Sequence, residues 1–193
     1  FRRGALPISA VGARVAAVGR GAAGDVTSAV GAEEAVSSAA ATLGGIDDLF
    51  VTAGVLHMGP LTDQAADAID ETLAVNLAAS VYLARAAYSH LSKSAGSLTL
   101  FTSSSFTKGR PNYAVYSATK AAIVNLMQAL ADEWSSANIR VNAVAPERAN
   151  TPMRKAAFPN EDHAALLSAE EVAAATLRLA ASGLTGQVLD VRR

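Results

Sequence analysis

The sequence has no cysteine, few aromatic residues and almost no net charge, and each of these absences excludes a class of protein. Without cysteine there is neither a disulfide framework nor a thiolate metal site. The three histidines, His57, His90 and His163, are too scattered to suggest metal ligands. A formal net charge of −1 gives no electrostatic basis for binding nucleic acid. The apolar runs are too short to span a membrane, and no apolar segment follows the basic residues at the start as it would in a signal peptide. We therefore expect a soluble cytoplasmic protein that binds no metal ion.

The sequence is rich instead in small apolar residues, which form alternating strand and helix patterns. With 193 residues, 51% of them apolar, a single domain over residues 1–193 is expected. Buried-strand patterns occur at residues 13–18, 46–51, 98–101, 139–145 and 186–191, and helical patterns at 29–43, 63–94, 114–136 and 168–182. This alternation predicts an α/β fold with a doubly wound, Rossmann-like parallel sheet covered by helices on both faces. A ligand would then bind outside the carboxyl ends of the strands.

The residues with the most distinctive chemistry lie between Thr102 and Lys120. Tyr116 and Lys120 are four residues apart at the start of a helical pattern, so their side chains share one helix face. A free phenol has a pKa near 10, and a nearby ammonium group favours the phenolate. Tyr116 is thus a candidate proton donor or acceptor, with Lys120 lowering its pKa. By itself the pair also fits a solvated helix surface, but Ser103 stands thirteen residues earlier, at the end of a strand.

With Gly109 and Pro111 in the intervening loop, this segment resembles the short-chain dehydrogenase/reductase family, whose catalytic strand-loop-helix carries Ser and Tyr-x-x-x-Lys at these offsets. The resemblance implies hydride transfer between the nicotinamide of a cofactor and a small-molecule carbonyl substrate. It implies that Tyr116 protonates the developing alkoxide while Ser103 hydrogen-bonds to the same oxygen. Lys120 would also hold the nicotinamide ribose.

Asn76 is a single asparagine among apolar residues in a helical pattern, where it is locally unfavourable. In the family that it resembles, this residue completes a Ser-Tyr-Lys-Asn set and holds a water that relays protons to the lysine. The other interpretation is a buried asparagine satisfied by backbone groups. After the preceding strand, Ala53 and Gly54 would let the backbone approach a cofactor closely, although Thr52 stands where the family usually has asparagine.

Residues 19–24 read Gly-Arg-Gly-Ala-Ala-Gly and match the dinucleotide-binding fingerprint Gly-x-Gly-x-x-Gly. In the family, the first glycine loop lies well upstream of the glycine-containing end of the fourth strand. Residues 51–54, which resemble that strand end, follow residues 19–24 by only about one βαβ unit, roughly 30 residues. This distance is too short for residues 19–24 to be the first glycine loop. We therefore favour the interpretation that residues 18–20 align with the end of the family's second strand. The sequence then lacks the first strand and its phosphate loop, either because it starts late or because the protein has lost them.

Arg20 would lie at the end of that second strand, where an arginine accommodates the 2′-phosphate of NADP and an acidic residue would favour NAD. NADPH is the expected cofactor, and an exposed loop arginine is the other interpretation. Asp25 and Val26 are candidates for contact with the adenine ring, although Asp25 or Thr27 could instead cap the following helix. The expected cofactor-binding residues are Gly19, Arg20, Asp25, Val26, Ala53, Gly54, Tyr116, Lys120, Pro146 and Thr151.

Four basic residues suggest the substrate. Lys108 and Arg110 precede Tyr116, and Arg148 and Arg154 follow Pro146; with Ser103 they form the expected substrate site. A guanidinium fork matches phosphate oxygens. These segments resemble more narrowly the reductase domains of bifunctional ribitol-5-phosphate cytidylyltransferases, which implies reduction of ribulose 5-phosphate.

Other interpretations stay open: the basic residues are solvated charges on a reductase of another carbonyl, or the chain is a non-catalytic scaffold with the same fold. Small apolar residues on the helical patterns 63–94 and 114–136 predict a homodimer or homotetramer, by analogy with the family.

Overall fold

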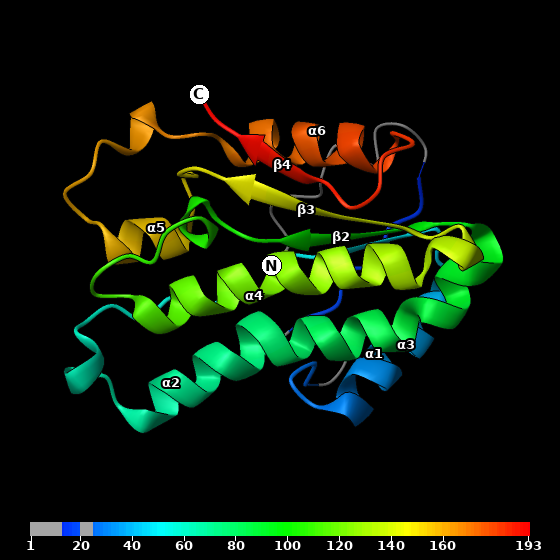
Figure 1. The fold of residues 1–193 in the computed structure, drawn as a ribbon, viewed down its shortest axis with the longest axis horizontal. Coiled ribbons are helices and arrows are strands. Elements are labelled where there is room, and N and C mark those ends of the chain that lie inside the picture. Colours follow the sequence, from blue (N-terminus) through cyan, green and yellow to red (C-terminus); the bar gives the residue numbers. More distant parts are fainter. Residues whose placement is uncertain (1–12, 20–24) are drawn as a thin grey trace.

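The structure is a computed structural model that describes residues 13–19 and 25–193. Its described part contains a four-stranded parallel sheet with the order β1-β2-β3-β4. The strands are β1 (Asp48–Val51), β2 (Ser97–Phe101), β3 (Arg140–Pro146) and β4 (Val188–Val191). Because all four strands run in one direction, their carboxyl ends share one edge of the sheet, and the arrows in Figure 1 point toward that edge.

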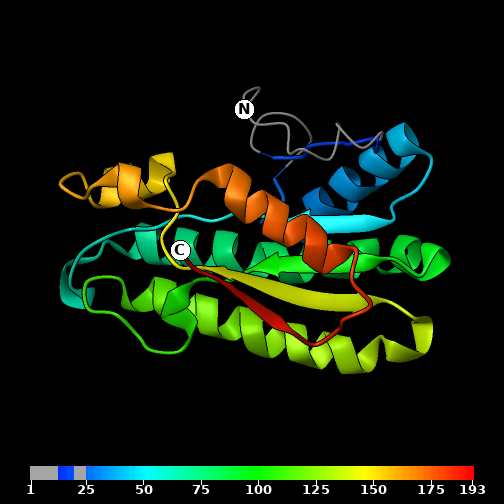
Figure 2. The ribbon, with the colours of Figure 1, turned by 90° about the horizontal axis from the view of Figure 1, so that it is seen from above.

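Helices cover both faces of this sheet. They are α1 (Ala29–Leu43), α2 (Ala66–Leu73), α3 (Ala79–Ser94), α4 (Ala114–Glu133), α5 (Pro152–Ala157) and α6 (Ala169–Ala180). Short 3-10 turns are η2 (Leu61–Asp63), η4 (Ser104–Phe106), η5 (Ser135–Ala137) and η6 (His163–Ala165). α3 and α4 pack on the sheet and α1 packs on α3, while Figure 2 shows α6 on the side of β3 and β4 opposite α4. None of the helices within the described ranges has the length and apolar character needed to cross a bilayer.

Alternating strand residues divide the core between the two faces, as expected for a sheet buried on both sides. On β3, Val141 and Ala143 belong to the larger cluster, which includes Ile123 of α4. The next residue along, Val144, belongs to a smaller cluster with Val172 and Leu179 of α6. All three of these β3 side chains are fully buried. This two-sided burial confirms the predicted doubly wound architecture.

The helix ends follow capping rules that are visible in the sequence. α1 begins after Ser28, whose hydroxyl accepts a hydrogen bond from the Gly31 amide at 3.1 Å. α6 begins with a capping box, in which Ser168 and Glu171 each accept from the other's backbone amide. α1 therefore has the predicted bounds, while Ser28 takes the capping position expected of Asp25 or Thr27.

The strand predicted at residues 13–18 is wrong. Residues 13–19 form no strand in the structure, and Val15 and Val18 are 54% and 37% exposed. Among the described strands β1 pairs with β2, and no strand pairs with residues 13–19. An apolar sequence alone does not make a strand without a pairing partner.

Candidate active site

Ser103, Tyr116 and Lys120 come together at the carboxyl edge of the sheet. Ser103, two residues beyond β2, lies close enough to Tyr116 in the first turn of α4 for its side chain to lower the pKa of the phenol. The Lys120 amine lies 5.6 Å from the centroid of the Tyr116 ring, and Nζ donates to the carbonyl of Phe101 at 2.9 Å. Tyr116 and Lys120 therefore share one face of α4, as their spacing predicted.

Three hydrogen bonds fix the start of α4 against its surroundings. The hydroxyl of Thr102 donates to the Lys120 carbonyl at 2.6 Å, which joins the end of β2 to α4. The hydroxyl of Ser117 accepts from the Arg110 amide at 3.2 Å and donates to the Tyr113 carbonyl at 3.1 Å. Ser117 and Thr119 are both buried, so small polar residues bring the helix close to its neighbours. The orientation of Tyr116 is thus set by buried contacts on both sides.

The loops beyond successive strands are also tied to one another. The Gly59 amide donates to the Asn112 carbonyl at 2.7 Å, which connects the loop after β1 with the loop before α4. Asn112 has a φ of 66°, a left-handed conformation that asparagine tolerates better than most residues. The Ser104 hydroxyl donates to the Glu147 carbonyl at 3.3 Å and connects the loops after β2 and β3. These contacts hold the loops at the carboxyl edge together.

Asn76 lies in a π-helical segment (Ala74–Ala78) between α2 and α3 and is 1% exposed. Its Oδ1 accepts from the Val55 amide at 2.8 Å, and its Nδ2 donates to the Val55 carbonyl at 3.0 Å. A second, longer contact of Nδ2 reaches the Thr119 hydroxyl at 3.4 Å. The side chain is therefore satisfied largely by backbone, which is one of the two interpretations of this residue. The contact with Thr119 also brings Asn76 next to α4.

Gly54 lies between these groups. A Cβ atom placed on Gly54 would be 3.6 Å from Oδ1 of Asn76 and 3.8 Å from Nζ of Lys120. The third close atom is Cε of Met153, at 3.8 Å. The absence of a side chain on Gly54 therefore leaves the approach to the Lys120 amine uncrowded.

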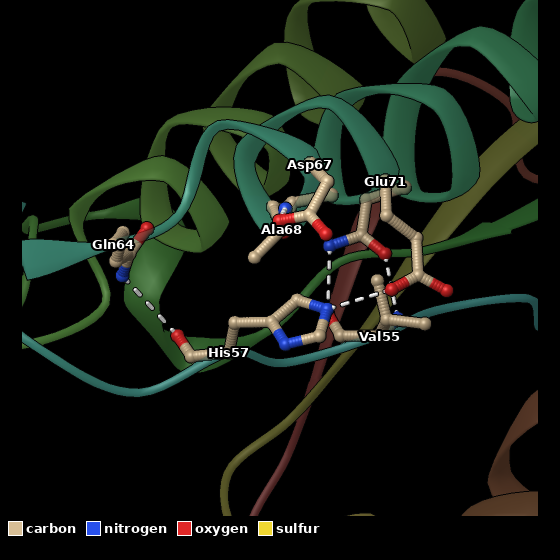
Figure 3. Close-up of polar contacts among 8 residues, drawn as sticks. Val55, His57, Gln64, Asp67, Ala68 and Glu71 are labelled. Carbon is tan, nitrogen blue, oxygen red and sulfur yellow. Dashed lines mark hydrogen bonds and ion pairs between the residues drawn. The ribbon is translucent and has the colours of Figure 1, made fainter.

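His57 and Glu71 brace the loop after β1 and were not found from the sequence. Nε2 of His57 lies 2.8 Å from a carboxylate oxygen of Glu71 on α2, and Gln64 donates to the carbonyls of His57 and Gly59 (Figure 3). An open cavity of about 340 Å³, lined by His57, Asp67, Ala68 and Glu71, adjoins this pair. Neither residue belongs to a sequence motif, and fourteen residues separate them, so the sequence contains no signal for this contact.

Burial dominates the electrostatics of Tyr116. It raises the pKa of the phenol, an effect partly offset by the hydrogen bond with Ser103 and by the positive charge of Arg154. Burial also lowers the pKa of Lys120 to about 8. The prediction that Lys120 lowers the pKa of Tyr116 below its usual value is therefore wrong for the described residues. Ser103 and Arg154, rather than Lys120, oppose the effect of burial.

The basic residues expected to bind substrate divide into two groups. Lys108 and Arg110 are exposed, and their side chains make no recorded hydrogen bond or ion pair with the described residues. Arg154 forms a two-point ion pair with Glu161, with nitrogen-oxygen distances of 2.7 and 2.8 Å, and Arg148 contacts the same carboxylate at 3.2 Å. The structure thus brings Arg148 and Arg154 together, through a residue that the sequence analysis did not consider.

The expected cofactor residues on later strands lie at the carboxyl edge. Ala53 and Gly54 follow β1, Pro146 ends β3, and Thr151 caps α5 by accepting from the Arg154 amide at 3.2 Å. Thr151 followed by proline is a common helix start, and it was the available signal for α5, which the sequence analysis missed.

The expected cofactor-binding residues that precede α1 are less well placed to contact a cofactor. Oδ1 of Asp25 accepts from the Thr27 amide and hydroxyl at 3.0 and 2.6 Å, in a turn before α1, and Val26 packs on the core. These contacts favour a local role for Asp25 over contact with an adenine ring. A Cβ at Gly19 would meet no described atom within 4 Å. Arg20 lies outside the described residues.

Comparison with known proteins identifies the family of the chain. A family model described as short chain dehydrogenase matches residues 7–162. The chain is 44% identical over 146 residues to the bifunctional ribulose 5-phosphate reductase/CDP-ribitol pyrophosphorylase Bcs1 of Haemophilus influenzae. That match covers 76% of this chain and 31% of the relative, so the chain spans less than a third of that protein's length.

Two solved structures share the fold. A gluconate 5-dehydrogenase from Burkholderia cenocepacia, in complex with NADP and tartrate, has a TM-score of 0.79 and 26% identity over 86% of this chain and 71% of its own. A 3-ketoacyl-(acyl-carrier-protein) reductase from Brucella melitensis, complexed with NADH, has a TM-score of 0.77 and 26% identity, covering 87% and 74%.

The fold and the comparisons together define an oxidoreductase with a parallel α/β sheet. The chain belongs to the short chain dehydrogenase family.

The lowered pKa of Lys120 predicts a specific pH dependence of stability. Below about pH 8 both folded and unfolded states bind this proton, and above about pH 10.4 neither does. Between these values the unfolded state binds more protons, so the free energy of unfolding should rise with pH. Over the whole window Lys120 should contribute a rise of about 3 kcal/mol, which Lys120→Met should lack.

Urea denaturation of both proteins between about pH 7 and pH 9.5 tests this, because Tyr116 is present in both proteins and the difference between their profiles isolates the contribution of Lys120. The wild-type protein should gain stability relative to Lys120→Met as the pH rises. Parallel pH profiles would show that the ammonium group is not buried as described.

Proposed function

We propose that this chain is an NADP(H)-dependent carbonyl reductase in which Ser103 and Tyr116 act on the oxygen of the substrate. The observation that carries the proposal is that Ser103 lies close enough to Tyr116 to lower the pKa of the phenol, with the Lys120 amine 5.6 Å from the centroid of the same ring, at the carboxyl edge of a parallel sheet. Ligands of doubly wound sheets bind at that edge. A hydroxyl and a phenol this close together can both reach one oxygen atom held between them.

The residues present fit the nicotinamide riboside end of such a cofactor, which would supply or accept the hydride. Lys120 has three N–H donors, and Phe101 O is the only acceptor recorded for them among the described residues. Two donors are thus available for ribose hydroxyls. Gly54 keeps the space beside this amine open, and Thr151 lies on the loop that follows β3.

Tyr116 acts as the proton donor during reduction. Because burial raises its pKa, the phenol stays protonated at neutral pH, which is the form that reduction requires. As negative charge develops on the carbonyl oxygen, the hydrogen bond from Ser103 and the positive charges of Lys120 and Arg154 stabilise that oxygen. Asn76 positions the Val55 backbone beside Lys120 through its two hydrogen bonds. Asn76 remains our candidate for holding the relay water, although its side chain is already occupied by Val55.

For the substrate we propose a phosphorylated ketose, with ribulose 5-phosphate as the first candidate. The relative in Haemophilus influenzae is named as a ribulose 5-phosphate reductase, which supports this choice. Arg148 and Arg154 converge on one carboxylate, so their guanidinium groups can also converge on a phosphate. For the cofactor we propose NADPH over NADH, on the basis of Arg20. Exposed apolar side chains on α3, such as Val81 and Tyr88, support self-association through this helix and α4.

Replacement of Tyr116 by phenylalanine tests the reaction. Tyr116→Phe removes the proton donor and keeps the ring, so turnover should fall about 10²- to 10⁴-fold while NADPH affinity changes little. Tyr113→Phe is the matched control: its ring packs edge-on against Tyr116 at 6.1 Å, and the loss of its hydroxyl should leave turnover nearly unchanged. Steady-state rates and NADPH fluorescence titration give both values. Near-normal turnover in Tyr116→Phe would refute the proposed role.

The substrate proposal predicts a preference for the phosphorylated sugar. Ribulose 5-phosphate should be reduced with a kcat/KM at least about tenfold higher than that of ribulose, since two arginines contact the phosphate. Assays of both sugars with NADPH and with NADH measure both preferences. Equal rates with the two sugars would exclude a phosphate subsite, and faster turnover with NADH would exclude the proposed cofactor.

A further inference from the structure

Glu161 occupies the centre of the basic cluster at the carboxyl edge. Its carboxylate contacts Nε and an Nη atom of Arg154 at 2.7 and 2.8 Å and an Nη atom of Arg148 at 3.2 Å. The side chain is 18% exposed, Arg154 is 22% exposed and Arg148 is 53% exposed. Two guanidinium groups thus share one partly buried anion, with Arg148 open to solvent. The same two arginines can form this arrangement around another anion of similar shape.

This cluster is linked to the catalytic tyrosine by ring contacts. The Arg154 guanidinium stacks on Phe158, with 3.7 Å from its central carbon to the ring centroid. Phe158 packs edge-on against Tyr113 at 6.3 Å, and Tyr113 packs in the same way against Tyr116 at 6.1 Å. In addition, the charge of Arg154 is close enough to lower the pKa of Tyr116. An anion bound by Arg154 would therefore belong to a molecule that also reaches the phenol.

Glu161 lies in a short turn between α5 and the 3-10 turn η6, outside both helical segments. Its amide donates to the Phe158 carbonyl at 3.2 Å, between the end of α5 and the 3-10 turn η6. The arginines are held more firmly: Arg154 lies in α5, and the Arg148 carbonyl accepts from Leu167 in a backbone contact that flanks the Ala149–Leu167 bridge. Movement of this turn could remove the carboxylate and leave both guanidinium groups in place.

We propose that Glu161 is a specificity-determining residue that occupies the anion site until the phosphate of the substrate displaces it. This inference rests on the proposed function and adds the identity of the competing group. A phosphate monoester carries a charge of about −1.5 to −2 near neutral pH, with three acceptor oxygens, whereas the carboxylate has one charge and two oxygens. The phosphate therefore satisfies the same N–H groups with more charge. An unphosphorylated sugar cannot displace Glu161 and gains nothing from either arginine.

The test compares Glu161→Gln with Glu170→Gln in the full-length protein. The glutamine at 161 keeps the shape and removes the competing charge, so inorganic phosphate should bind about 3- to 10-fold more tightly. Glu170, exposed in the first turn of α6, makes no recorded ion pair with the described residues, and its substitution should leave phosphate affinity unchanged. The dependence of the thermal midpoint on phosphate concentration measures this affinity without turnover or cofactor.

Steady-state kinetics provide a second, independent test. The ratio of kcat/KM for ribulose 5-phosphate to that for ribulose should rise in Glu161→Gln by a similar factor. Adding Arg148→Gln to this variant should reverse the gain in phosphate affinity. Weaker or unchanged phosphate binding in Glu161→Gln would overturn the proposal, because Glu161 would then only organise the loop. Since phosphate binding is measured without catalysis, the result stands even if the chain reduces a different carbonyl.

Discussion

The hydrogen bond between the buried Lys120 amine and the Phe101 carbonyl is the contact on which the arrangement of the carboxyl edge of the sheet depends. It crosses from the middle of α4 to the last residue of β2, and the Thr102 hydroxyl reinforces the connection from the opposite direction. An ammonium group that is 5% exposed is costly to bury, and burial accordingly lowers its pKa to about 8. The protein tolerates this cost at the place where Tyr116 and Ser103 meet. Such a cost at neutral pH is typical of a functional site rather than of a structural ion pair.

The part of the site that depends on local spacing could be predicted from the sequence. Tyr116 and Lys120 share a helix face because of helical periodicity, and Ser103 follows a strand whose carboxyl end is recognisable as the end of an apolar run. In a parallel sheet the ends of successive strands share one edge, so Gly54 and Pro146 could be placed near Ser103 before any coordinates were considered. The resemblance of this segment to the short-chain dehydrogenase/reductase family is confirmed by the comparisons.

The remaining features depend on contacts that no spacing rule contains. Glu161 pairs with arginines seven and thirteen residues away across a turn, and His57 meets Glu71 across a loop. Their residue types are ordinary for exposed loops, so the sequence offers no reason to select them. The direction of the pKa shift of Tyr116 likewise depends on burial, which is a property of the packed structure. Residues 13–18 are apolar enough for a strand, but pairing rather than composition decides whether a strand forms.

The proposed function combines one oxygen site with two donors and an anion site with two arginines. It requires Ser103 and Tyr116 to act as a unit on one carbonyl oxygen, and a double-mutant cycle on kcat/KM with Ser103→Ala and Tyr116→Phe measures that coupling most directly. If both side chains act on the same oxygen, the double variant should be barely slower than Tyr116→Phe alone. Losses that multiply, as they do for independent sites, would contradict the proposed function.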